Sequence, residues 1–486
     1  MRARLAWALL TALGCGGSGS AVVPDVTATE PEYNARCGVE GPVLLLDLEA
    51  NEHPFRVDPV PGEDRVLVGL FEAAGSLGLF PDRTREAIVS VGPCGESPTL
   101  VAEDMALVGA YEEVQLACAS DGDALYRVDP TGESEPVLLL AGTCAVRRTD
   151  AGLVAVLSGG GGVGRLVIMR EPGAAAVVVE TLLDNVVVPT NVFFGGGDYR
   201  STPLWASGGE AITLTPDGLV LAVDLQDSAV SVLAEGAASF LAAADGRRIV
   251  WQVDDVEQHD EEAPAGVIVL HDRDAGTDLP LLKSHLPWTT SPFRHGWVVL
   301  RDNSVLGQRL FDGDTGESLG LPEGTALRAV LGDAQFWLAR DTDGRTEELL
   351  WEPPSEPRLI IDHAEGFAEK SGDGFKVFAY NAADGLEGTL SYGSFDGGVE
   401  RWSDRVNFHH RVLADGRILG IVDEDSNQHG ALRLEDPGTG ALVMVDPHGY
   451  LHSPSLNAND LFAGDVVYSV DGDGESRHGL YRASIR

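Results

Sequence analysis

Four histidines are the residues whose type and spacing most clearly suggest chemistry in this sequence. His363, His409 and His452 are separated by 46 and 43 residues, and each stands at a predicted strand. His295, in SPFRHGWVVL, is a candidate fourth member of the set. Imidazoles that converge on one site can bind a transition metal or an anionic ligand. The alternative is that these side chains hydrogen-bond to neighbouring backbone and fill the wall of the fold.

Two short motifs match catalytic patterns. Gly316 to Gly320 reads GESLG and fits the GxSxG pattern of hydrolases, and Gly159 to Gly164 fits the GxGxxG pattern of dinucleotide-binding folds. In both of those folds the motif leads from a strand into a helix. Here strand-like segments lie on both sides of each motif, so we predict hairpin turns without a catalytic role.

Several acidic segments resemble fragments of calcium loops. They are Asp312 to Asp314, Asp341 to Gly344, Asp423 to Asp425 and Asp471 to Glu475. None has the third ligand and the distant Glu that a twelve-residue calcium loop requires. Asp and Gly also favour tight turns, because they tolerate left-handed backbone geometry. The sequence therefore favours turns over calcium sites.

These candidate residues belong to a repeated pattern. LFDGDTGESL, from Leu310, is a short apolar strand, a turn and a second apolar strand, and variants of it recur along the chain. Aligning ten copies on the first turn residue gives Asp47, Gly92, Asp129, Glu171, Asp224, Asp272, Asp312, Glu352, Asp396 and Asp436. Their mean spacing is near 43 residues. Two further strand-like runs, joined by Asp-Gly turns, lie between many copies, and four strands in about 40 to 50 residues are typical of one propeller blade.

The pattern predicts an all-β protein, a β-propeller of four-stranded blades. The first unit, from Pro42, shows only a hairpin, and the stretch from Leu451 shows three strands without a fourth. We therefore expect the N-terminal and C-terminal segments to pair in one blade, which closes the ring. Ten units exceed the usual four to eight blades, so incomplete units or two rings are alternatives to a single large ring. Helical periodicity is scarce, and the clearest candidate is GAASFLAAA around Ser239.

The N-terminus has the pattern of an export signal. Arg2 and Arg4 precede the apolar run Leu5 to Leu13, which is too short to span a membrane. The run Ala12 to Cys15 resembles the lipobox of bacterial lipoproteins, and this implies that Cys15 carries lipid. Gly after the Cys implies the outer membrane. An ordinary signal peptide cleaved near Gly16 to Ala21 is the alternative.

These observations divide the chain into three parts. Residues 1–15 are predicted to be the lipoprotein signal peptide, 16–40 a flexible Gly/Ser-containing tether and 41–486 the propeller. We expect an exported protein that faces the periplasm or the cell surface and touches the membrane only through its lipid.

Cysteine usage is consistent with export. Apart from Cys15 there are four cysteines, all in the first third of the chain: Cys37, Cys94, Cys118 and Cys144. An even number favours two disulfides in an oxidising compartment, with three pairings open. No CxxC pair occurs, which argues against a zinc site.

Charge excludes one class of partner. The 486 residues contain 76 Asp and Glu against 34 Lys and Arg, a net charge of −42. Such a surface repels phosphate backbones, so we expect no nucleic-acid binding. The acidity itself is interpreted as a solvated coat that keeps a large β-protein soluble, and the alternative is that it attracts cations or a basic partner.

Two turn types resemble known propeller repeats. The Asp-x-x-Thr-Gly turns at Asp312 to Gly316 and Asp436 to Gly440 resemble the PQQ-like repeat, and Pro216 to Gly218 resembles the TolB-type repeat. Lipid-anchored propellers of this kind include the PQQ-like subunit of the outer-membrane protein assembly machinery, a non-catalytic scaffold. The resemblance implies a similar scaffold role here.

The leading hypothesis is thus an envelope-anchored lipoprotein whose propeller binds a protein partner or a small ligand without catalysis. The alternative is a periplasmic or surface enzyme, a quinoprotein-like oxidoreductase or a lyase, with its site at the central channel. Catalytic residues dispersed over several blades would not form a motif. A calcium-dependent adhesin is a third hypothesis. No specific cofactor is indicated by the sequence.

Overall fold

The computed structural model describes residues 33–484 with internal gaps. The residues left out within that range are 35–36, 50, 61–62, 64, 74–82, 189–203, 254–265, 285–292, 303–306, 343–344, 363–365, 372–373, 381–386, 396, 408–409, 414–416, 423–429, 437–438, 440, 450, 451–464 and 471–477. Every regular element of the described residues is a β-strand, which confirms the all-β class. Among these residues no helix has the length and hydrophobicity needed to cross a membrane.

The described strands form nine four-stranded antiparallel sheets. The first five are β4–β7 (Glu52–Pro59, Val66–Ala73, Arg83–Val91, Thr99–Glu103), β8–β11 (Met105–Tyr111, Val114–Ala119, Ala124–Val128, Val137–Ala141), β12–β15 (Val146–Thr149, Gly152–Ser158, Val163–Met169, Val179–Val187), β16–β19 (Leu204–Ser207, Glu210–Leu214, Val220–Asp224, Val230–Ala234) and β20–β23 (Ala237–Ala242, Arg248–Val253, Gly266–Asp272, Thr277–Ser284). The next four are β24–β27 (Phe293–Arg294, Trp297–Asp302, Gly307–Asp312, Ser318–Leu319), β28–β31 (Thr325–Val330, Phe336–Thr342, Arg345–Trp351, Arg358–Ile361), β32–β35 (Gly366–Ser371, Gly374–Tyr380, Glu387–Ser394, Val399–Asn407) and β36–β39 (Arg411–Val412, Ile418–Val422, Gly430–Asp436, Ala441–Gly449).

A tenth sheet combines both ends of the described chain. It has three strands in the order β3 (Val43–Asp47), β41 (Gly479–Ser484) and β40 (Asp465–Val470). Val43 pairs with Arg482, and Asp47 pairs with Gly479. A short separate pair, β1 (Tyr33–Asn34) with β2 (Val39–Glu40), precedes it.

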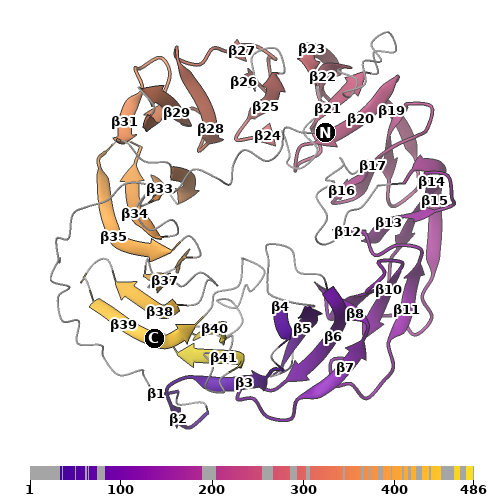
Figure 1. Ribbon diagram of the computed structural model, residues 1–486. Coiled ribbons are helices and arrows are strands. Elements are labelled where there is room, and N and C mark those ends of the chain that lie inside the picture. The colour runs from indigo at the N-terminus through magenta and orange to yellow at the C-terminus, as the bar shows by residue number, and fades with distance from the viewer. Residues whose placement is uncertain are drawn as a thin grey trace.

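The sheets follow one another around a single ring (Figure 1), so the protein is a β-propeller with ten blades. Strands within each four-stranded blade pair in sequence order. The first strand of a blade lies nearest the ring axis and the fourth lies outermost. We call these the axial strand and the rim strand of the blade.

Nine of the ten predicted hairpins are confirmed as the third and fourth strands of a blade, and LFDGDTGESL is β26 with β27. Two predictions were wrong. The hairpin predicted after Leu44 does not exist, because β3 pairs with β41 and β4 pairs with β5 in the next blade. The segment GAASFLAAA contains strand β20 rather than a helix. Pairing with Val250 and Trp251 of β21 overrides the helical preference of its alanines.

Each blade is buried on both faces. In β13 the consecutive residues Leu153 to Val156 are all at most 3% exposed. Leu153 and Ala155 pack in a cluster with residues of the second blade, whereas Val154 and Val156 pack in a cluster with residues of the fourth blade. Alternate side chains of one strand therefore serve two different cores, because successive residues point to opposite faces of a sheet. A strand of this kind reads as a continuous apolar run.

The junction between the tenth and first blades has its own core. Leu46, Val467 and Leu480 of the tenth blade pack with Val57, Val68 and other residues of the first. Polar contacts add to it. His478 N𝜀2 lies 3.1 Å from the Glu52 carbonyl oxygen, and Arg482, which is 3% exposed, donates to the Pro93 carbonyl oxygen at 2.8 Å.

We expect Leu480→Ala to weaken this junction. Leu480 is fully buried, so truncation removes apolar contacts and leaves a cavity that costs about 2–5 kcal/mol. Thermal melting should show a lower Tm, and hydrogen exchange should increase in β3, β4 and β41. Leu359→Ala is the matched control, because Leu359 is 48% exposed on rim strand β31. An unchanged Tm and exchange pattern in Leu480→Ala would contradict the packing described here.

Candidate functional site

The predicted histidine set is described only in part. His295 lies in the turn between β24 and β25, is exposed and has φ of 46°. His363, His409 and His452 lie outside the described residues. In the chain, His363 and His409 come shortly before the axial strands β32 and β36, whereas His295 follows its axial strand. Their convergence on one site stays a prediction.

A different pair of histidines meets at the junction of the first and tenth blades. His53 on β4 is 5% exposed, and its ring lies edge-on to the ring of His478, with centroids 6.0 Å apart. His53 also packs against Phe71, at 5.5 Å. Sequence spacing did not indicate this pair, since 425 residues separate its members. Their packing among buried residues indicates a structural role.

The cysteines form two disulfides, Cys37–Cys94 and Cys118–Cys144. Sequence left three pairings open, and the fold selects this one by bringing each pair of Cα atoms to 5.4 and 5.5 Å. The first bond attaches the turn between β1 and β2, in the stretch predicted as tether, to the β6–β7 turn of the first blade. The second bond joins β9 to the segment that leads into β12. The lipidation candidate Cys15 lies outside the described residues.

The two catalytic-looking motifs are hairpin turns, as predicted. Gly316 has φ of 69°, and its N–H donates to the Asp312 carbonyl oxygen at 2.9 Å inside the β26–β27 turn. Residues 159–162 connect β13 to β14, and Gly160, Gly161 and Gly162 all have positive φ. No helix follows either motif, so neither has the setting that its chemistry requires.

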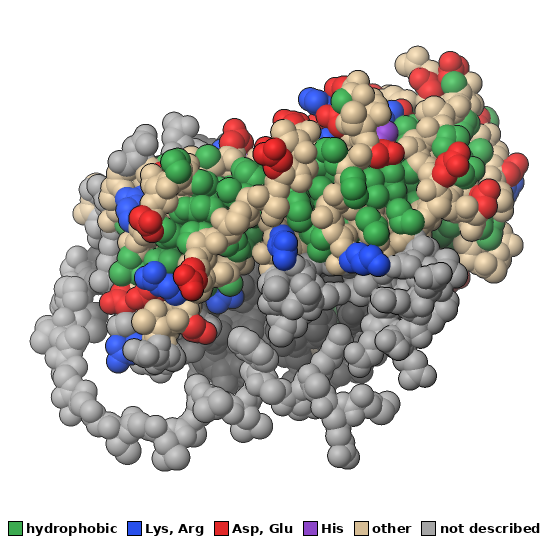
Figure 2. All heavy atoms as spheres, turned by 90° about the horizontal axis from the view of Figure 1, so that it is seen from above, with side chains coloured by type: hydrophobic (Ala, Val, Ile, Leu, Met, Phe, Trp, Pro, Cys, Tyr) green, Lys and Arg blue, Asp and Glu red, His purple; other side chains and the backbone are tan. Residues whose placement is uncertain are grey.

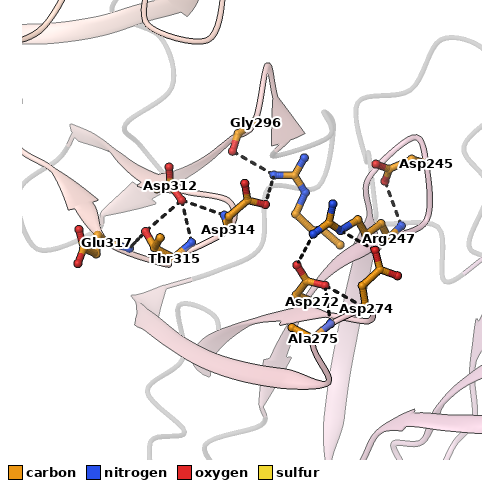
Figure 3. A network of polar contacts seen from close by, with 11 residues as sticks. Asp245, Arg247, Asp272, Asp274, Ala275, Gly296, Asp312, Asp314, Thr315 and Glu317 are labelled. Atoms are coloured by element: carbon orange, nitrogen blue, oxygen red, sulfur yellow. Dashed lines mark hydrogen bonds and ion pairs between the residues drawn. The ribbon is translucent and has the colours of Figure 1, made fainter.

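The repeated aspartate is a turn residue. Asp312 accepts hydrogen bonds from the N–H groups of Asp314 and Thr315, at 2.9 and 2.7 Å, and from the Thr315 hydroxyl (Figure 3). Asp129, Asp224 and Asp272 accept backbone N–H groups of their own turns in the same way. Among the described residues, no group of three or more His, Cys, Asp or Glu side chains is arranged to hold a metal. The turn interpretation is confirmed for Asp312.

Arginines connect these turns within and between blades (Figure 3). Arg247 binds Asp272 and Asp274, each at 3.1 Å, and so joins the two turns at one end of the fifth blade. The neighbouring Arg248 donates to the Gly296 carbonyl oxygen at 3.2 Å and lies 3.7 Å from the Asp314 carboxylate, both in the sixth blade. The network is structural, since its carboxylates are already bound to backbone and guanidinium donors.

These hydrogen bonds change the pKa of the aspartates. Burial alone would raise the pKa of Asp272, but the N–H of Ala275, the guanidinium of Arg247 and the N–H of Asp274 outweigh burial, and the pKa is lowered. The pKa of Asp312 is lowered in the same way, against burial, chiefly by the N–H groups of Thr315 and Asp314. Both carboxylates are stabilised in the charged form.

The surface feature that is not explained by folding lies on the rim. The large hydrophobic side chains that are exposed in the described residues all lie on rim strands or directly beside them. Eight of the ten lie on five consecutive blades, and we call them the apolar rim arc: Leu44, Leu100, Val137, Leu138, Val178, Val179, Val230 and Val232. They are 38–67% exposed. Figure 2 looks from above onto the side of the ring that lies at the top of Figure 1, mostly outside the arc, and shows hydrophobic side chains between charged groups there.

The rim strands of the arc also have an unpaired edge. Strands β7, β11, β15 and β19 each end a sheet, so one row of backbone N–H and C=O groups faces away from the blade. Proteins usually protect such edges with charges or proline. Strands β11 (VLLLA) and β19 (VSVLA) contain neither. Neither strand carries a charged side chain along its edge, and an uncharged edge of this kind can pair with another extended chain.

Comparison with known proteins gives one relative by sequence. The outer membrane protein assembly factor BamB of Alkalilimnicola ehrlichii is 30% identical over 164 residues, which cover 26% of this chain and 42% of that protein. The chain thus matches less than half the length of this relative. No family model matches the sequence.

Comparison with solved structures finds several similar chains, all at low identity and low TM-score. The computationally designed Ika8 protein has a TM-score of 0.32 and 15% identity, covering 74% of this chain and 99% of that one. The tricorn protease has a TM-score of 0.27 and 13% identity, covering 88% of this chain and 46% of that one. The acylaminoacyl peptidase of Pyrococcus horikoshii has a TM-score of 0.30 and 12% identity, covering 82% of this chain and 53% of that one. TM-scores this low give no basis for comparing functions.

The turn network yields a pH prediction. We expect Asp272→Asn to destabilise the protein by about 1–3 kcal/mol at pH 7, because charged hydrogen bonds are lost. The pKa of Asp272 is lowered in the folded protein. The carboxylate therefore contributes its full stabilisation at pH values above its unfolded pKa of about 3.9. This stabilisation is lost as the pH falls through the folded pKa. The Tm difference from the unmodified protein should therefore shrink below about pH 4. The control is Asp150→Asn, in the exposed turn between β12 and β13. A Tm difference that is constant from pH 7 to acid would show that the charge of Asp272 does not matter.

Proposed function

We propose that this protein is an exported, lipid-anchored scaffold of the cell envelope that binds a partner protein along its rim. The apolar rim arc carries the proposal. Eight exposed apolar side chains lie on five neighbouring blades, one or two on each, and an exposed apolar patch can mark an interaction surface. The expected occupant is an extended segment of the partner that adds a strand to β11 or β19.

The sequence relative supports this assignment. That protein is named as an outer membrane protein assembly factor, and the similarity covers 26% of this chain. We extend to this chain the envelope location and the role of holding a protein partner. Two disulfides in the fold are consistent with an oxidising compartment outside the cytoplasm.

We also propose that the pairing of β3 with β41 closes the ring. Closure by both segments would keep neighbouring blades of the arc at fixed positions relative to one another, because a shift at one blade junction would have to be accommodated at the others. The hydrogen exchange of β3 in Leu480→Ala reports on this closure.

The rim can be tested with two substitutions. Leu138→Asp and Val232→Asp place a charge on β11 and β19, where the native side chains are 50% and 55% exposed. We expect each substitution to abolish cross-linking of the protein to its partner in envelope fractions. The Tm should change no more than is usual for a surface substitution, which alters stability by about 0.5 kcal/mol or less. The matched control is Leu359→Asp, which alters a side chain 48% exposed on β31, outside the arc.

A photo-reactive residue at position 138 should cross-link one defined protein in those fractions, and the same residue at position 359 should not. Equal cross-linking from positions 138 and 359, or equal cross-linking of the partner to the Leu138→Asp, Val232→Asp and Leu359→Asp variants, would show that the arc is not the binding surface.

The anchor has a separate test. We expect Cys15→Ala to move the protein from the membrane fraction to the soluble fraction, because one lipidated residue provides the proposed attachment. The double variant Cys37→Ala, Cys94→Ala should stay with the membrane. If Cys15→Ala remained membrane-bound, attachment would have to come from another part of the chain.

A further inference from the structure

The backbone edge of rim strand β11 is unpaired along the whole strand. β11 is the last strand of its sheet, on the outside of the ring (Figure 1), and it pairs only with β10. Among the described residues, the backbone groups of 137–141 form no hydrogen bond outside that pairing. Val137 and Leu138 are 38% and 50% exposed beside this edge. An extended chain can add a strand to such a row of N–H and C=O groups.

Carboxylates stand at both ends of this uncharged strand. Glu133 and Glu135 precede it in the β10–β11 connection, and both are exposed. Asp121 and Asp123, also exposed, lie in the β9–β10 turn. This turn is beside the other end of β11, because the first residue of β10 pairs with the last residue of β11. The strand is therefore apolar along its length and acidic at each end.

The carboxylates on the neighbouring rim strands are neutralised by arginine, whereas those around β11 are not. Glu103 on β7 lies 2.6 Å from Arg85, and Glu180 on β15 lies 2.9 Å from Arg170. Among the described residues, no arginine or lysine lies within ion-pair distance of the four carboxylates around β11. The protein itself thus supplies no cation to balance these charges.

Strand β19 has the same arrangement two blades further along the ring. It contains no charged residue, and its Val230 and Val232 are 47% and 55% exposed. Asp227 stands shortly before the strand and Glu235 directly after it, and both are exposed. In the part of the chain that the structure describes, neither carboxylate forms an ion pair. An uncharged edge with acidic ends therefore occurs twice within the apolar rim arc.

These charges argue against an occupant that comes from the protein itself. Pairing of β11 with β11 of a second copy would place acidic ends beside acidic ends in either strand direction, and like charges opposite each other are destabilising. Residues 16–32 of the chain contain three acidic residues and no Lys or Arg, so they would meet the same repulsion. We therefore expect the occupant to be a segment of a different protein.

We propose that the segment bound at β11 is an extended chain of alternating apolar residues with a Lys or Arg at each end. The inference rests on the proposed function, since β11 belongs to the apolar rim arc, and it adds the chemistry of the bound segment. Backbone groups of the segment pair with the open edge, and its apolar side chains cover Val137 and Leu138. Its basic ends meet the four carboxylates. β11 has five residues and spans about 16 Å, which sets the distance between the two basic residues.

The test compares three peptides blocked at both ends, KVTVTVK, EVTVTVE and KVTPTVK in one-letter code. Binding to the purified protein is read by cross-linking from a photo-reactive residue at position 138, because this position reports on β11 and not on β19. KVTVTVK should bind about tenfold or more tightly than EVTVTVE, since each exposed ion pair contributes up to about 1 kcal/mol. KVTPTVK should not bind, because proline removes a backbone donor. The preference for KVTVTVK should shrink in high salt.

A matched pair of variants tests the acidic end. Glu135→Lys should weaken binding of KVTVTVK about fivefold and strengthen binding of EVTVTVE. The control is Glu356→Lys, which should bind all three peptides as the unmodified protein does. Glu356 is also exposed and also stands two residues before a rim strand, β31, with a proline between. Melting curves establish that each variant is folded.

Several results would overturn the inference: no cross-linking of KVTVTVK at millimolar concentration, equal cross-linking of KVTVTVK and EVTVTVE, or equal weakening in Glu135→Lys and Glu356→Lys. A dimer in sedimentation that Leu138→Asp abolishes would assign the edge to a second copy and would also overturn it. The proposed function fails on a different result, which is that no protein of the envelope fractions cross-links from position 138.

Discussion

Each blade of this protein must be covered on both faces. Strands such as β13 and β18 place consecutive apolar residues on opposite sides of the sheet, so a blade with only one neighbour would expose half of its hydrophobic side chains. A row of such blades is satisfied only when the last blade packs on the first. The ring, the clusters between its blades and the meeting of the chain ends all depend on this constraint.

Several kinds of interaction act where β3, β41 and the first blade lie together. Strand β3 pairs with β41, the Cys37–Cys94 disulfide attaches the preceding segment to the first blade, and Arg482 donates to the Pro93 carbonyl oxygen. The contact that chain connectivity does not maintain is that of β41 with β3 and with the first blade, and there the backbone pairing and the Arg482 hydrogen bond act. The disulfide instead limits the separation of the segment before β3 from the β6–β7 turn.

Arginine serves two separate purposes here. At the blade junctions it donates to turn carbonyls of the next blade, as Arg127 does to Pro172 and Ala174, and as Arg248 does to Gly296. Its several fixed N–H donors suit this bridging better than a lysine ammonium. On the axial strands, Arg56 and Arg148 instead reach the same residue, Gly109 on the blade between them.

The sequence determined the repeat, the all-β class and the turn role of Asp312, because hairpins and turn hydrogen bonds are local interactions. It mistook the segment around Ser239 for a helix and the residues after Leu44 for a hairpin, because pairing with β21 and with β41 is decided between segments distant in the chain. Only the tertiary structure selected the cysteine pairs, placed the exposed residues of the rim arc on neighbouring blades and brought Arg56 and Arg148 to Gly109. Those features depend on which faces and strand ends the ring places side by side, and spacing along the chain does not contain that information.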